Sequence, residues 1–220
     1  GITGPGLIEI IRKQAQRFGT RFITKNVTKV DFSSRPFKVW IGQELFQAKS
    51  IIISTGASAK YLGLPSEKKY MNRGVSACAT CDGAFYKNVE VGVIGGGDTA
   101  MEEAQFLTRF ASTVYVIHRR DSFRASKIMA DRVLNHPKIK VLWNKEIVEV
   151  LGNDLSMNGV IIKDLVTGQT EKKKLEGLFL AIGHKPNTDL FKGILDLNEI
   201  GYIKTKPGST YTNIPGVFAA

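Results

Sequence analysis

The sequence predicts an α/β fold in two domains, with a parallel sheet built around a βαβ unit and an antiparallel meander beside it. Two apolar runs, residues 90–94 and 113–118, are typical of buried parallel strands. Between them, residues 99–110 place apolar side chains at helical spacing and follow three consecutive glycines. The meander is expected from short strands at 21–27 and 37–41, with a turn between them.

The segments before this unit carry their own boundary signals. A helix is expected across residues 1–19, because Thr3 can cap its start and Gly19 can end it. Residues 47–54 predict a buried strand, and residues 59–69 a polar linker that marks a domain boundary.

The segments after it predict one more helix and a series of strands. The helix is expected at 126–135, before Pro137. The strands are expected at 139–143, 147–151, 160–165, 172–175 and 178–182, with a last apolar strand at 216–220.

Composition excludes several classes of protein. With 43% hydrophobic and 23% charged residues, the 220-residue chain has the balance of a soluble globular protein. No apolar run is long enough to span a membrane, and no secretory signal is visible. The net charge of +11 does not favour nucleic acid, because the basic residues are scattered and not interleaved with aromatic side chains. An anionic cofactor and an acidic partner fit it better.

A glycine-rich turn is the first candidate site. Residues 95–100 read Gly-Gly-Gly-Asp-Thr-Ala and lie between a predicted strand and a predicted helix, which is the context that a dinucleotide-binding turn requires. Gly95 allows the tight turn, Gly97 lets the backbone approach a pyrophosphate, and Ala100 permits close packing. The residues assigned to this site are Gly95, Gly96, Gly97, Asp98 and Thr99. A ligand-free βα turn is the alternative.

A basic segment indicates which dinucleotide binds. An NAD site places a carboxylate about 20 residues beyond the glycines, but here the sequence is His-Arg-Arg. Guanidinium groups suit the 2′-phosphate of NADP(H). The residues assigned to this phosphate are His118, Arg119, Arg120 and Arg124. A solvated basic face is the alternative.

The only two cysteines form the third candidate site. Cys78 and Cys81 are separated by two residues, which favours a reversible dithiol and disulfide pair. Asp82 follows them and could supply a proton to a departing thiolate. An inert buried pair remains an alternative. A zinc site is another, although it would need two further ligands from His118, His136 and His184, whose spacing does not suit metal binding. No metal site is predicted.

Together these motifs resemble the low-molecular-weight thioredoxin reductases. The resemblance covers essentially all of the chain and rests on six stretches: Gly-Ile-Thr-Gly-Pro at the start, Ser-Thr-Gly-Ala-Ser at 54–58, Cys-Ala-Thr-Cys-Asp-Gly from Cys78, the glycine turn with His-Arg-Arg-Asp, Ala-Ile-Gly-His-Lys-Pro-Asn-Thr at 181–188, and the final Gly-Val-Phe-Ala-Ala.

The resemblance implies a three-layer, Rossmann-like fold with a split FAD domain and an inserted NADPH domain. The FAD domain would comprise residues 1–60 and 184–220, and the NADPH domain residues 61–183. Electrons would pass from NADPH through FAD to the cysteine pair and on to thioredoxin. Cys81 would face the flavin, Cys78 would attack thioredoxin, and Asp82 would act as the acid. A domain rotation is expected, because dithiol and nicotinamide share one domain.

The resemblance also sets expectations for the rest of the site. Thr55, Gly56 and Ala57 are assigned to FAD, and Ile182 and Gly183 complete the cofactor-binding residues. The family's N-terminal flavin-binding turn is absent, so the chain is expected to be a fragment with an incomplete FAD domain. A cytoplasmic homodimer without membrane or nucleic-acid partners is expected. Two other functions stay open: the flavoprotein component of alkyl hydroperoxide reductase, and an NADP-binding module without turnover.

Overall fold

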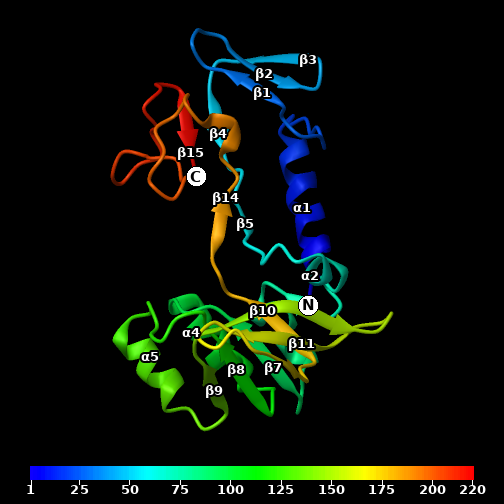
Figure 1. Ribbon diagram of the computed structural model, residues 1–220. Helices are drawn as coiled ribbons and strands as arrows, with labels where there is room; N and C mark the ends of the chain where they lie inside the picture. Colours follow the sequence, from blue (N-terminus) through cyan, green and yellow to red (C-terminus); the bar gives the residue numbers. More distant parts are fainter. The chain divides into compact units, whose positions relative to one another are not determined.

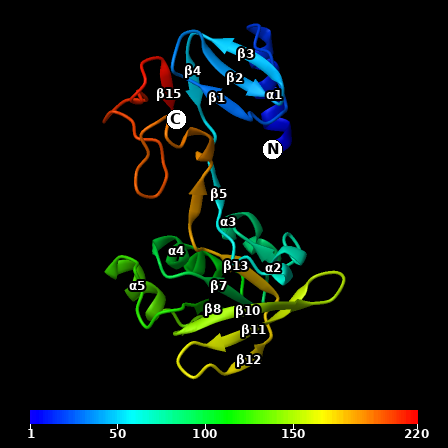
Figure 2. The ribbon, with the colours of Figure 1, turned by 45° about the horizontal axis from the view of Figure 1, so that its top comes forward.

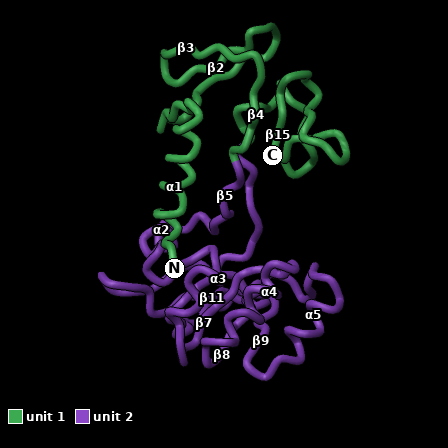
Figure 3. The backbone as a smooth tube through the Cα atoms, turned by 180° about the vertical axis from the view of Figure 1, so that it is seen from behind, with its two compact units in different colours: residues 1–55, 188–220 green, residues 56–187 purple.

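The computed structural model describes residues 1–220, which form two compact units (Figures 1 and 3). Unit 1 combines Gly1–Thr55 with Thr188–Ala220, and unit 2 is Gly56–Asn187. The chain therefore crosses between the units twice, within five residues of the predicted boundaries at 60 and 183. The assignment of one cofactor to each unit stays a prediction.

A five-stranded parallel sheet forms the centre of unit 2. Its strands lie in the order β6, β13, β7, β8, β9. Their bounds are β6 Val75–Ser76, β13 Gly177–Leu180, β7 Glu90–Ile94, β8 Thr113–Ile117 and β9 Ile139–Leu142. The predicted βαβ unit is confirmed, because β7 and β8 pair in parallel from Glu90 with Thr113 to Ile94 with Ile117.

Helices and a second sheet cover the two faces of this parallel sheet (Figure 2). On one face, α4 (Asp98–Leu107) buries apolar side chains against β7 and β8, and α5 (Lys127–Leu134) packs against α4 and β9. On the other lies the antiparallel sheet β10 (Lys145–Gly152), β11 (Met157–Asp164) and β12 (Thr170–Lys173). Unit 2 thus has the three layers that were predicted.

Shorter elements complete unit 2. They are β5 Ala57–Ala59, which pairs antiparallel with β14 His184–Pro186, then α2 Pro65–Lys69, α3 Ala79–Asp82 and the 3-10 helix η1 Gly83–Phe85. The segment 59–69, expected as a polar linker at a domain boundary, contains the short helix α2. Glu67 is buried, and its carboxylate accepts hydrogen bonds from the backbone N–H groups of Leu62 and Gly63.

Unit 1 contains one long helix and the predicted meander. Helix α1 (Gly4–Arg17) begins where expected, with the Thr3 hydroxyl accepting a hydrogen bond from the Gly6 N–H at 3.3 Å. The meander consists of β1 Lys29–Asp31, β2 Phe37–Ile41 and β3 Glu44–Ala48, followed by β4 Ile51–Ile53, the 3-10 helix η2 Asp189–Phe191 and β15 Val217–Ala219. Strands β4 and β15 pair in parallel.

The strand predicted at residues 21–27 is wrong. Every side chain of that segment is exposed, so its apolar residues pack against no neighbouring strand. The first strand of the meander is instead Lys29–Asp31, whose Val30 is buried opposite Val39 of β2. Across the whole structure, no helix has the length and apolar character needed to cross a membrane.

Candidate functional site

The glycine-rich turn connects β7 to α4, and its first and last glycines have different surroundings. Gly95 has a φ of +152°, and a Cβ there would overlap the carbonyl oxygen of Ala181 and lie 2.7 Å from the Cβ of Ala100. Gly97 caps α4 with a φ of −101°, and a Cβ there would meet nothing within 4 Å. Gly95 is therefore required by packing, whereas Gly97 leaves its backbone open to a ligand.

Gly96 and His118 form a contact behind this turn. A Cβ on Gly96 would lie within the His118 imidazole, 2.6 Å from Nε2. The His118 side chain is buried, its Nε2 lies 3.1 Å from the Ser122 carbonyl oxygen, and its ring packs against Phe123 and Trp143. Burial lowers the pKa of His118, which keeps the ring neutral at neutral pH. His118 thus supports the turn from behind.

A basic loop follows β8 and is fastened to the turn by hydrogen bonds. The Arg124 N–H donates to the Gly96 carbonyl at 2.7 Å. The Asp98 carboxylate accepts from the backbone N–H and the hydroxyl of Ser126, at 2.8 and 2.9 Å. The three arginines predicted to bind a 2′-phosphate are exposed on this loop: Arg119, Arg120 and Arg124. The structure therefore brings the predicted pyrophosphate and 2′-phosphate residues together.

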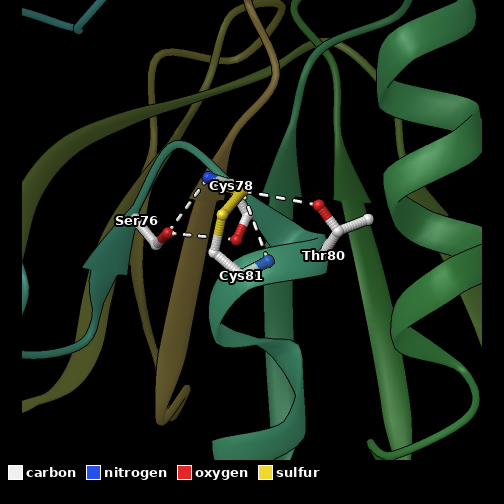
Figure 4. The surroundings of a disulfide bond; sticks show 4 residues. All are labelled: Ser76, Cys78, Thr80 and Cys81. Carbon is white, nitrogen blue, oxygen red and sulfur yellow. Dashed lines mark hydrogen bonds between the residues drawn. A yellow bond between two sulfur atoms is a disulfide. The ribbon is translucent and has the colours of Figure 1, made fainter. Parts of the chain in front are cut away.

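Cys78 and Cys81 form a disulfide at the start of α3 (Figure 4). Cys78 caps the helix, and its Sγ accepts a hydrogen bond from the Cys81 N–H at 3.3 Å. The Thr80 hydroxyl lies 3.4 Å from the same sulfur, and the Cys78 N–H donates to the Ser76 hydroxyl at 3.0 Å. Cys78 is half-buried and Cys81 is exposed. The Cys78 sulfur therefore has two donor groups that would stabilise a thiolate.

Asp82 ends α3 and is half-buried. Its backbone N–H donates to the Cys78 carbonyl at 3.2 Å. Burial, and to a lesser extent the Asp82 charge, raise the pKa of Tyr86. The structure places Asp82 beside the disulfide by sequence, and its role as an acid stays a prediction.

One cleft of about 610 Å³ is lined by residues of both sites. Thr80 comes from the disulfide helix, and Thr99 from the start of α4. Its remaining wall includes Glu102 and Glu103 of α4 and His136 beyond α5. One residue beside the disulfide and one beside the glycine turn, Thr80 and Thr99, therefore line the same hollow of unit 2.

Glu103 was missed by sequence reasoning. Burial raises the pKa of this carboxyl to about 7, although the Ala79 backbone N–H partly opposes the rise. Its Oε2 is buried and has no hydrogen-bond partner. A signal was present, since Glu103 lies three residues after Ala100 and four before Leu107, both fully buried on the core face of α4.

The residues predicted to contact a flavin lie where the chain crosses between the units. Thr55, Gly56 and Ala57 are exposed, and the Gly56 carbonyl accepts from the Asn187 N–H at 2.9 Å. Ile182 and Gly183 are half-buried just before β14, and the Gly183 carbonyl accepts from the Lys60 N–H at 2.9 Å. Beyond these residues, unit 1 contains no glycine turn between a strand and a helix.

Comparison with known proteins gives consistent results. A family described as "Pyridine nucleotide-disulphide oxidoreductase" matches residues 5–220. The chain is 52% identical to thioredoxin reductase 2 of Arabidopsis thaliana, covering 100% of this chain and 60% of that protein. It is 47% identical to the thioredoxin reductase of Coxiella burnetii, covering 100% of this chain and 71% of that protein. The chain thus spans about 60% of the length of the Arabidopsis relatives.

Solved structures agree with the sequence matches. The thioredoxin reductase of Giardia duodenalis superposes with a TM-score of 0.81 at 42% identity, covering 100% of this chain and 72% of that one. The enzyme of Streptococcus pyogenes superposes with a TM-score of 0.80 at 38% identity, covering 99% and 71%.

Proposed function

Because the chain belongs to the pyridine nucleotide-disulphide oxidoreductases and, among them, to the thioredoxin reductases, we propose that the whole protein is an NADPH-dependent thioredoxin-disulfide reductase. The observation that carries this proposal is the Cys78–Cys81 disulfide, which lies in the same unit as the glycine turn. NADPH and H⁺ would convert one thioredoxin disulfide to a dithiol and leave NADP⁺.

The nucleotide-binding residues of unit 2 fit NADPH. The open backbone at Gly97, at the N-terminus of α4, suits a pyrophosphate, since a helix N-terminus attracts anions. The exposed Arg119 and Arg120, with Arg124 held on the turn, would bind the 2′-phosphate as charge-assisted donors. Asp98 helps by fixing the loop through Ser126.

The two cysteines would have different roles. When bound, NADPH supplies a hydride and FAD passes its two electrons on to a disulfide. Opening the Cys78–Cys81 bond yields a thiol and a thiolate, and the N–H of Cys81 and the Thr80 hydroxyl favour the thiolate on Cys78. We propose that Cys78 attacks the thioredoxin disulfide, that Cys81 closes the bond again, and that Asp82 donates the proton to the leaving sulfur.

The flavin belongs to the proposal for the whole protein. Within this chain, the residues available for FAD are the exposed segment 55–57 and the neighbouring 182–183. They do not by themselves frame a flavin ring. A homodimer and a cytoplasmic location are likewise proposals. Location can be checked by cell fractionation, since a relative from Kluyveromyces lactis is named mitochondrial.

The test uses the full-length, flavin-loaded protein. Cys78→Ser should abolish thioredoxin reduction, because the attacking sulfur is gone. Reduction of the flavin by NADPH should continue, since it precedes the disulfide. Both rates can be followed by absorbance, with Ser76→Ala as a control that removes a hydroxyl near the same pair. If thioredoxin reduction survives Cys78→Ser, the pair is not on the electron path.

A further inference from the structure

The half-buried carboxyl group of Glu103 lines the cleft beside the disulfide helix and has no part in the proposed chemistry. It lies on α4, which packs against α3, and it lines the same cleft as Thr80 of α3. Ala79 is almost fully buried and directly follows Cys78. The carboxyl therefore lies beside the segment that holds the attacking sulfur.

When the carboxyl group of Glu103 is ionised, its Oε2 atom has no hydrogen-bond donor to stabilise the charge. Oε2 is buried without a hydrogen-bond partner, and an ionised carboxylate in such a place is costly. Protonation removes that cost. Burial is accordingly the main reason why the pKa of Glu103 reaches about 7.

Other charges surround this carboxyl. The charged or titratable groups on the elements packed around it are Asp82 of α3, Tyr86 after η1, Glu102 of α4, Arg109 after α4 and His136 after α5. The core residues behind α4, from β7 and β13, are apolar. Burial, and not a neighbouring charge, is therefore the main cause of the raised pKa of Glu103.

We propose that Glu103 is a positioning residue for the Cys78–Cys81 couple and that its carboxyl group exchanges a proton with Cys78. Glu103 loses the proton when Cys78 becomes a thiol and gains it when Cys78 becomes a thiolate. The inference rests on the proposed function and deepens it. A dithiol reductant supplies two electrons and two protons and becomes a disulfide itself; the Cys78–Cys81 bond breaks, one proton goes to Cys81, and the second goes either to Cys78 or to an ionised Glu103. With the proton on Glu103, Cys78 stays a thiolate. With Glu103 ionised, like-charge repulsion favours the Cys78 thiol.

The test measures thiol reactivity, not turnover. The full chain is reduced with dithiothreitol, freed of it, and alkylated with iodoacetamide between pH 5 and 10, with mass spectrometry to follow Cys78. The wild type should show two pH steps, because two coupled groups titrate. Glu103→Gln should show one step, moved down by about one pH unit as expected for removal of a nearby negative charge, with up to about tenfold faster alkylation on the rising limb.

Matched variants separate a specific effect from a general one. Glu102→Gln removes the same charge one residue away and should keep both steps. Glu103→Asp keeps a titratable group and should also keep two. A wild-type profile in Glu103→Gln, or the same shift in Glu102→Gln, would overturn the proposal.

A second measurement covers a variant that does not fold. Infrared difference spectra of the wild type, reduced minus oxidised at pH 7, should contain a carboxylic-acid band, and its absence would refute the link between proton and disulfide. Failure of the proposed function looks different. In that case, dithiothreitol would release no pair of free thiols, or thioredoxin turnover would survive Cys78→Ser.

Discussion

Replacing the first and last glycines of the turn by alanine separates packing from ligand binding. In Gly95→Ala the new methyl would overlap the Ala181 carbonyl oxygen and press on Ala100. Overpacking of this kind costs about 1–3 kcal/mol. The positive φ of +152° adds about 1–3 kcal/mol for a residue with a side chain. Unit 2 should therefore lose about 2–6 kcal/mol of unfolding free energy.

Gly97→Ala should behave in the opposite way. Its φ of −101° is allowed for alanine, and its Cβ meets nothing within 4 Å. Stability should stay within about 0.5 kcal/mol or rise slightly, because alanine restricts the unfolded chain. The methyl should instead obstruct the pyrophosphate and weaken NADPH binding at least about tenfold, or about 1.4 kcal/mol.

The two tryptophans make the assay specific for each unit. Trp40 lies in unit 1, and Trp143 lies in unit 2 with its ring centroid 4.4 Å from that of Phe123, beside the basic loop. Urea unfolding followed by Trp143 fluorescence in a Trp40→Phe background reports on unit 2, and calorimetric titration gives the NADPH affinity. Wild-type stability in Gly95→Ala would refute the packing argument. Unchanged NADPH affinity in Gly97→Ala would refute the ligand argument.

Three further predictions concern the loop and α4. Arg119→Ala or Arg120→Ala should each weaken NADPH binding by about 1.5–3 kcal/mol with little effect on NADH, and equal loss of both nucleotides in titrations would show general electrostatics. Asp98→Ala removes the two hydrogen bonds to Ser126 and should weaken NADPH binding by about 0.5–1.5 kcal/mol while hydrogen exchange of the loop rises. The pKa of Glu103 rises from 4.5 to about 7 on folding, so the native state keeps a proton that the unfolded chain loses, and stability should fall by about 3 kcal/mol between pH 4.5 and 8. Urea midpoints in Glu103→Gln should lack that fall, and an equal fall in the variant would contradict the assignment.

The fold could be predicted best where the signals are local. Strands β7 and β8 are continuous apolar runs around a glycine turn, and few arrangements other than a βαβ unit fit such a pattern. The segment 21–27 has apolar residues too, but a strand also needs a neighbouring strand to pair with. The local sequence does not reveal that residues 29–31, and not 21–27, pair with β2. Helix α2 has only five residues, too few to show a helical period.

The same contrast between local and long-range signals applies to the candidate site. The cysteine pair was predictable because its chemistry is specific to its residue type, whereas the roles of the glycines and arginines in cofactor binding stay predictions. Asp98 was predicted as a ligand contact, but its carboxylate fastens the loop through Ser126, 28 residues away. His118 was predicted to contact the phosphate, but its ring lies buried behind Gly96. Such roles depend on which segments fold against each other, and spacing alone does not reveal them.

Helix α4 links the two sites and limits how they can move. Its N-terminus forms part of the glycine turn, and Glu103 on its flank lines the same cleft as Thr80 of the disulfide helix. Its core face is fully buried, so α4 cannot tilt without disrupting the packing of unit 2. A bound dinucleotide and the disulfide would therefore keep a fixed separation. If both must reach one flavin in turn, we expect unit 2 to move as a whole at the two chain crossings, after Thr55 and Asn187.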